Sequence, residues 1–114
     1  MTLDTFLKKL KSTPETIAFS ETMSVIDANY DFTPTAFTNG TLENAEGQNS
    51  GSCKLFAFAK AQELSKDETL ACFGDFYFTD VLKDARGTGH QNIRNFMKTG
   101  FEGLNFEKHP LKRK

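Results

Sequence analysis

The chain has 114 residues and a mass of 12.8 kDa, which is the usual size of one domain and below that of two. Its 12 phenylalanines predict a phenylalanine-rich core, and its net charge of −1 gives no sign of a nucleic-acid-binding domain. No apolar run approaches the ~20 residues that cross a bilayer, and the first residues lack the apolar stretch and cleavage site of a secretory signal peptide. We therefore expect one domain, no membrane span and no signal peptide.

The first 30 residues carry the spacing of two helices. Apolar residues recur at i, i+3, i+4 and i+7 from Leu3 to Leu10, which predicts an amphipathic helix. Thr13, which precedes a proline, and Ser20 are both suited to cap a second helix. We expect this second helix to end near Asn29.

The periodicity fails from Asp31 to Ser52, where Thr, Asn, Gly, Glu and Ser dominate. Asn39-Gly40 is a strong hairpin signal because both residues tolerate positive φ. The segment therefore predicts a small β-hairpin over residues 32–44 with this pair at its turn. Leu104 to Phe106 fits a short C-terminal strand that would pair with residues 32–37 of the hairpin.

The strongest apolar segment follows this irregular region. Ser52 predicts the cap of a helix over residues 53–64 that is apolar around most of its circumference, as expected for the centre of the core. Ser65 to Glu68 matches a capping box, which predicts that the next helix starts there. We expect that helix to continue through a weak point at Gly74 and to end near Asp84.

Thr88 predicts the cap of a last helix, and Gly100 predicts its end. Phe101, which follows that glycine, is placed to contact Phe96. The expected fold is thus mainly α with a minor β component. It is a single compact domain of about five helices, with a hairpin around residues 32–44 and a short C-terminal strand.

Charge is distributed unevenly along the chain. Residues 1–107 contain all 15 acidic residues and ten of the 14 basic ones, whereas residues 108–114 contain four basic residues and no acidic one. This asymmetry predicts a folded domain of residues 1–107 followed by a basic, flexible tail of residues 108–114. A solvated tail is favoured over a nucleic-acid or membrane contact.

Four blocks, YDFTPTAFTNG, GQNSGSCKLFAFAKAQEL, LACFGDFY and GTGHQNIRNFMKTGF, occur in this order from Tyr30 to Phe101. With them the chain resembles the HopJ type III effector family over residues 3–106. The resemblance implies a bacterial protein, some of whose relatives are delivered into plant cells by type III secretion. It implies location in the bacterial cytoplasm or, after secretion, in a host cell, and it implies no known chemistry.

One enzymatic hypothesis follows from the residues themselves. Cys53 lies at a predicted helix start, where the helix dipole favours a thiolate, and His90 would serve as its base. Asn39 or Asn92 would orient that histidine, giving a cysteine hydrolase arrangement. The favoured alternative is a buried, inert cysteine and a histidine that bonds a loop carbonyl.

The sequence contains no usual pattern of metal ligands and no familiar cofactor-binding motif. Cys53, Cys72, His90 and His109 have the atoms of zinc ligands, but their spacings match no usual ligand pattern. The two cysteines predict free thiols in a reducing compartment. The familiar phosphate, dinucleotide, zinc-protease and serine-hydrolase motifs are missing from the sequence, so we expect no metal and no cofactor.

Binding residues are expected in the irregular segment. Asn39, Gln48, Asn49 and Ser50 belong to its richest cluster of hydrogen-bonding side chains. For Asn39 a turn role is favoured, whereas for Gln48 and Asn49 turn and binding roles are equally supported.

The sequence favours a binding module that contacts a host or bacterial protein rather than an enzyme. The alternative is a cytoplasmic housekeeping domain that binds a small ligand or acts as a cysteine hydrolase. A deep pocket that joins Cys53, His90 and the loop asparagines would favour the alternative. A closed core with an exposed aromatic patch would favour partner binding.

Overall fold

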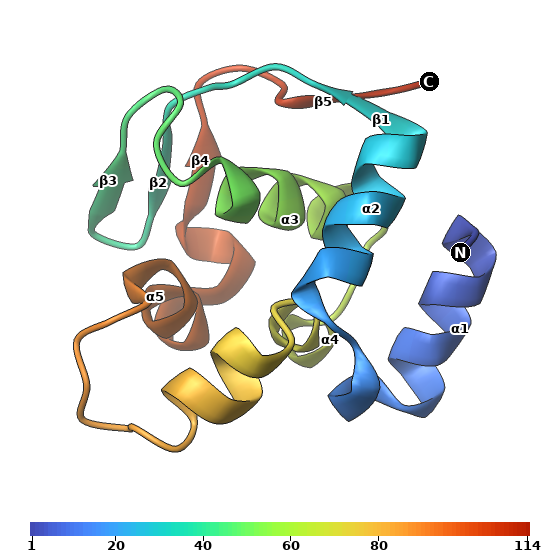
Figure 1. The fold of residues 1–114 in the computed structure, drawn as a ribbon. Coiled ribbons are helices and arrows are strands. Elements are labelled where there is room, and N and C mark those ends of the chain that lie inside the picture. The colour runs from blue at the N-terminus through green and yellow to red at the C-terminus, as the bar shows by residue number, and fades with distance from the viewer.

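Helix α3 (Ser50–Ala61) runs through the middle of the computed structural model, which describes residues 1–114 (Figure 1). Helices α1 (Leu3–Ser12), α2 (Phe19–Asn29) and α4 (Lys66–Ala71) pack around one end of it, and α5 (Gln91–Thr99) lies near the other. The solvent-accessible surface of 6401 Å² agrees with the roughly 6,300 Å² that area scaling predicts for one domain of this mass.

The first helix is confirmed, whereas the second begins differently from the sequence prediction. Pro14–Thr16 forms one 3₁₀ turn between α1 and α2, and Ala18 is the N-cap of α2. The Ala18 N–H donates to Glu21 Oε1 at 3.0 Å, which replaces the serine or threonine cap that we expected at Thr13 or Ser20. The predicted end of this helix, at residue 29, is confirmed.

The predicted hairpin is present but shifted. Strands β2 (Phe37–Asn39) and β3 (Leu42–Asn44) pair antiparallel, and β4 (Leu104–Phe106) pairs with the other edge of β2. Residue 39 is the last residue of β2, so the turn consists of Gly40 and Thr41, one position later than expected. The positive φ of +62° at Gly40 explains why a glycine occupies this turn. The C-terminal strand is confirmed, although it pairs with residues 37–39 rather than with 32–37.

The C-terminal tail contains a strand that pairs with the domain. Strand β5 (Leu111–Arg113) pairs antiparallel with β1 (Tyr30–Phe32) in a separate two-stranded sheet. The Thr33 N–H donates to the Pro110 carbonyl at 2.8 Å, and the Lys114 N–H donates to the Asn29 carbonyl at 3.0 Å. Backbone pairing that the residue composition does not reveal therefore attaches the tail to the domain (Figure 1).

The segment predicted as one long helix is divided. The capping box that begins α4 is confirmed, because Ser65 Oγ accepts the Glu68 N–H at 3.1 Å. The chain then turns at Gly74, where φ is +61°, and continues as a π-helical segment, Phe76–Val81. A β-carbon at Gly74 would lie 2.8 Å from backbone atoms before α2, so this glycine is required by close packing as well as by its dihedral angle.

Helices α3 and α5 start one turn or less from the predicted caps. Their N-cap residues are Asn49 and His90, each in the left-handed conformation, instead of Ser52 and Thr88. Gly100 ends α5 as predicted. The expected contact between Phe96 and the residue after that glycine is confirmed, with ring centroids 5.1 Å apart.

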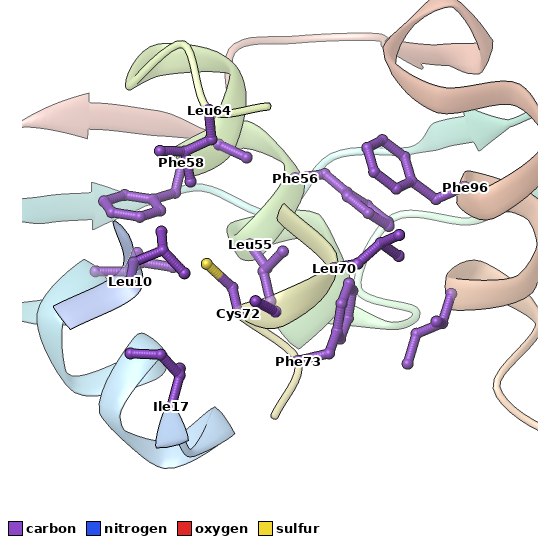
Figure 2. Close-up of a cluster of buried hydrophobic side chains, with 14 of the residues drawn as sticks. Leu10, Ile17, Leu55, Phe56, Phe58, Leu64, Leu70, Cys72, Phe73 and Phe96 are labelled. Atoms are coloured by element: carbon purple, nitrogen blue, oxygen red, sulfur yellow. The ribbon is translucent and has the colours of Figure 1, made fainter. Parts of the chain in front are cut away.

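The core is one cluster of 21 buried apolar residues, and α3 contributes more of them than any other element. The Phe56 ring lies 4.9 Å from the Phe96 ring on a tilted plane and meets Phe73 edge-on at 5.4 Å, which joins α3 to α5 and to the turn after α4. Figure 2 shows these rings together with Leu55 and Cys72 in the same apolar cluster. The prediction of a mainly α domain with a phenylalanine-rich core is confirmed.

Candidate functional site

An open cleft lies where the starts of α3 and α5 approach the π-helical segment. It has a volume of about 450 Å³, and its walls include Phe19, Asn49, Phe76, His90, Gln91 and Asn92. We call it the aromatic cleft. It brings together three of the residues that the sequence singled out, namely His90, Asn92 and Asn49.

Phe76 is the exposed apolar residue of this cleft. Its side chain is 40% exposed, although it lies at the start of the π-helical segment, beside the core. The Phe19 ring meets it edge-on with centroids 5.2 Å apart, and the His90 ring lies 5.3 Å away on a tilted plane. The cleft thus has an aromatic wall that is in part open to solvent. Such a surface suits contact with an apolar or aromatic group.

His90 is held between two elements. Its Nε2 lies 3.2 Å from Asp80 Oδ2, and its backbone φ of +54° is one that non-glycine residues adopt uncommonly. Both side chains are well exposed, at 38% and 47%, so their interaction contributes little to stability. The contact orients the imidazole over Phe76 and leaves the ring accessible to a bound group.

The two helix starts leave hydrogen-bond donors at the cleft. Neither Asn49 nor His90 caps its own helix with its side chain. The first-turn N–H groups of a helix have no partners within the helix and carry its positive dipole end. Gly51, Ser52 and Gln91 from these first turns line the cleft. The cleft can therefore satisfy hydrogen-bond acceptors beside its aromatic wall.

The two asparagines that line the cleft, Asn49 and Asn92, belong to a hydrogen-bonded group of asparagines. Asn92 Oδ1 accepts from Asn39 Nδ2 at 3.1 Å and from Asn44 Nδ2 at 3.2 Å. Asn44 Oδ1 accepts from Asn92 Nδ2 at 3.0 Å and from Asn49 Nδ2 at 2.6 Å. This asparagine network ties β2 and β3 to the starts of α3 and α5. The network also contains a buried acceptor without a partner, Asn39 Oδ1.

Asn44 is a member of this network that the sequence did not single out. A polar residue at the end of a weak strand reads as an ordinary loop-flanking residue. Asn39 was favoured as a turn residue, yet it is fully buried and its amide donates to Asn92 across the fold. Nothing in the local sequence shows that segments about 50 residues apart would share one polar cluster.

The cysteines do not line the cleft. Cys53 and Cys72 are free and buried in the core. Burial raises the pKa of the Cys53 thiol to about 11 and that of the Cys72 thiol to about 12. The start of α3 does not offset this effect, because residue 53 lies past the first three N–H groups. Cys53 and His90 are not brought together as a nucleophile and a base.

Gln48 and Ser50 make local contacts. Gln48 Oε1 accepts the Ala45 N–H at 3.0 Å, and Ser50 Oγ donates to the Gly47 carbonyl at 3.3 Å. Gln48 also borders a separate hollow of about 580 Å³ beside β2, β3 and β4. The loop residues predicted as one binding cluster therefore lie on different surfaces.

No three His, Cys, Asp or Glu side chains gather closely enough to hold a metal ion, and His109 lines a different groove from His90. None of the helices combines the length and the apolar character that crossing a bilayer requires.

Fold and cleft together define a small, mainly helical single-domain protein with an aromatic cleft at two helix starts. The model of the HopJ type III effector protein family matches residues 3–111, so the chain belongs to this family. The match extends past residue 106 into β5. The chain is also similar to the crystal structure of VPA0580, a protein of unknown function. The two share 55% identity and a TM-score of 0.98 over 100% of this chain and 95% of that one. A search of the curated proteins found no match.

Proposed function

We propose that this protein is a binding module that contacts a partner protein through the aromatic cleft. The observation that carries the proposal is the exposure of Phe76 at the cleft, next to an otherwise closed core. Aromatic side chains that are open to water on a stable scaffold are the residues that most often anchor a partner. Phe19 and His90 flank the ring and would enclose a side chain that the partner inserts.

Family membership suggests in which cell the binding takes place. Membership of the HopJ type III effector protein family is consistent with an effector-like protein that a bacterium exports and that acts on a host protein. Retention in the bacterial cytoplasm, with a bacterial partner, is the alternative. In both cases the binding surface is the aromatic cleft.

A second candidate function is the binding of a small ligand in the same cleft. Its volume of about 450 Å³ falls within the ~300–1,000 Å³ range of ligand pockets. Its donors at the helix starts and its aromatic wall would hold a small, flat molecule with hydrogen-bond acceptors. Cysteine hydrolysis is less supported, because the Cys53 thiol is buried and its pKa is raised to about 11.

A photo-crosslinking experiment tests partner binding at the cleft. Phe76 is replaced by p-benzoylphenylalanine in the full-length protein, which is then irradiated in host extract and in bacterial extract. The matched control carries the same group at Leu82, which is 47% exposed and does not line the cleft. We expect a discrete adduct from position 76 that is absent from position 82 and is reduced by His90→Ala. Equal adducts from both positions, or none from position 76, would contradict the proposal.

Secretion is tested separately, because the site of action and the binding surface are independent. The tagged protein is expressed in its source bacterium with and without a working type III apparatus, and a cytosolic marker controls for lysis. Export that depends on the apparatus supports the effector role. Retention directs the search for a partner to bacterial proteins.

A further inference from the structure

The C-terminal segment carries the excess positive charge of a chain that is otherwise acidic. Residues 108–114 contain no acidic residue and four basic ones, Lys108, Lys112, Arg113 and Lys114. Residues 1–107, in contrast, have a net charge of −5. Pairing of β5 with β1 holds these cations on the domain surface. None of the four forms an ion pair, although three other lysines of the protein do so with a carboxylate.

A groove with an apolar floor lies beside two of these cations, Lys108 and Arg113. It has a volume of about 480 Å³ and lies between α3 and the chain from β4 to β5. Ala57, Leu104 and Leu111 contribute apolar surface, and Lys60, Lys108 and His109 line it as well. Glu107 is its single carboxylate. We call this groove and its cations the basic groove.

Tyr30 connects the groove to the strand cations. Its ring lines the groove, and the Arg113 guanidinium lies over it at 5.3 Å from the ring centroid. The Tyr30 hydroxyl accepts a hydrogen bond from Gln62 Nε2 at 2.8 Å, which fixes the ring from the α3 side. The Arg113 charge is thus held at a fixed place beside the groove.

We propose that the basic groove docks an acidic segment of a partner protein that inserts an apolar side chain between α3 and β4. Lys60 and Lys108 at the groove and Arg113 over Tyr30 are unpaired cations beside an apolar hollow, and they complement a segment in which carboxylates flank such a side chain. The surface shares no lining residue with the aromatic cleft, so the inference does not depend on the proposed function.

The structure favours a protein segment over larger polyanions. An anionic membrane or a nucleic acid would face the acidic remainder of the domain as well as the groove, and repulsion would oppose the contact. The large apolar residues that are exposed, Met1, Phe76 and Leu82, lie outside this groove, so it lacks an apolar group to insert into lipid. Tyr30 is buried beneath Arg113 and offers no open face on which a base would stack.

The test measures fluorescence anisotropy of a labelled synthetic peptide of glutamates around one central leucine, titrated with the full-length protein. Lys60→Glu/Lys108→Glu reverses two exposed groove charges. Lys8→Glu/Lys83→Glu makes the same change of net charge at exposed sites outside the groove. We expect the groove variant to weaken binding at least about tenfold and the control variant less than about twofold. Added salt should weaken binding by the unmodified protein.

Two comparisons complete the experiment. Replacing the central leucine of the peptide with glutamine should weaken binding, because the apolar floor would lose its occupant. Vesicles that contain phosphatidylserine and a single-stranded oligonucleotide are titrated under the same conditions. Equal loss in both protein variants, no effect of the leucine, no peptide binding, or tighter binding to vesicles or oligonucleotide would each overturn the proposal. Circular dichroism confirms that both variants remain folded.

Discussion

Replacing Asn92 with alanine should destabilise the protein by about 3 kcal/mol, because its side chain joins the asparagine network. The substitution removes its three side-chain hydrogen bonds, which measure 3.0, 3.1 and 3.2 Å. Asn39 Nδ2 keeps a bond to the main-chain carbonyl of residue 92 at 2.7 Å, and Asn44 Oδ1 keeps its bond from Asn49. Asn44 Nδ2 loses its hydrogen-bond partner.

The expected loss of stability depends on which groups keep a hydrogen-bond partner and which do not. Two bonds to groups that keep another partner contribute about 0.5 kcal/mol or more each, and a buried amide that is left unpaired costs about 1–3 kcal/mol. The expected total is about 2–4 kcal/mol, which corresponds to a fall in Tm of roughly 8–16 °C for a domain of this size. Urea unfolding followed by far-UV circular dichroism measures the free energy of unfolding, and calorimetry measures Tm.

Two variants decide whether the network is the cause. Asn105→Ala changes an exposed asparagine on β4 and should alter the free energy of unfolding by less than about 0.5 kcal/mol. Asn44→Ala/Asn92→Ala should cost less than the sum of its single substitutions, because it also removes the amide that Asn92→Ala leaves unpaired. A loss below about 1 kcal/mol for Asn92→Ala, or strictly additive costs, would refute the reasoning.

Gly74→Ala should destabilise the protein by about 3 kcal/mol, because φ is +61° and the new β-carbon would lie 2.8 Å from backbone atoms. Gly47→Ala is the control, because the space around Gly47 is open, and it should cost about 1 kcal/mol. Urea unfolding measures both changes. Both thiols should resist iodoacetamide at neutral pH in the folded protein and react after denaturation. The reason is that burial raises the pKa of Cys53 to about 11 and that of Cys72 to about 12. Rapid alkylation of the native protein, detected by mass spectrometry, would contradict this prediction. The pKa of Glu21 is lowered from 4.5, chiefly by the hydrogen bond from Lys9, so its contribution is complete above about pH 4.5 and is lost as the pH falls through the lower folded value. Urea unfolding of Glu21→Gln should therefore depend less on pH in that acidic range, and an unchanged dependence would count against the pair.

Local signals predicted most helices, whereas the starts of α3 and α5 were not predicted by their nearby serine and threonine. The capping box at Ser65 and the end of α5 at Gly100 depend on a few neighbouring residues, and both are confirmed. At the starts of α3 and α5, Asn49 and His90 take the cap position although serine and threonine lie nearby. Asn49 bonds to Asn44, which the buried network links to Asn92 in the first turn of α5, so the asparagine network overrides the local preference.

The candidate site was predicted in part. His90, Asn92 and Asn49 were singled out from the sequence, and the structure brings them to one cleft. Phe76 was missed, because an aromatic residue within an expected helix reads as core. The break at Gly74 changes the direction of the chain and exposes that ring. The role of the tail was missed for a similar reason, since strand pairing depends on backbone groups that every sequence carries.

His90→Gly should separate stability from binding at the aromatic cleft. Glycine relieves about 1 kcal/mol of left-handed backbone strain at φ +54°. The substitution also removes the exposed contact to Asp80 and the ring contact to Phe76, which together stabilise the protein by about the same amount. The net change in the free energy of unfolding should therefore stay within about 1 kcal/mol. If the imidazole serves binding, crosslinking from position 76 should fall in this variant while urea unfolding hardly changes. A large loss of stability would mean that the ring is retained to hold α5 on the π-helical segment, and unchanged crosslinking would remove His90 from the binding surface.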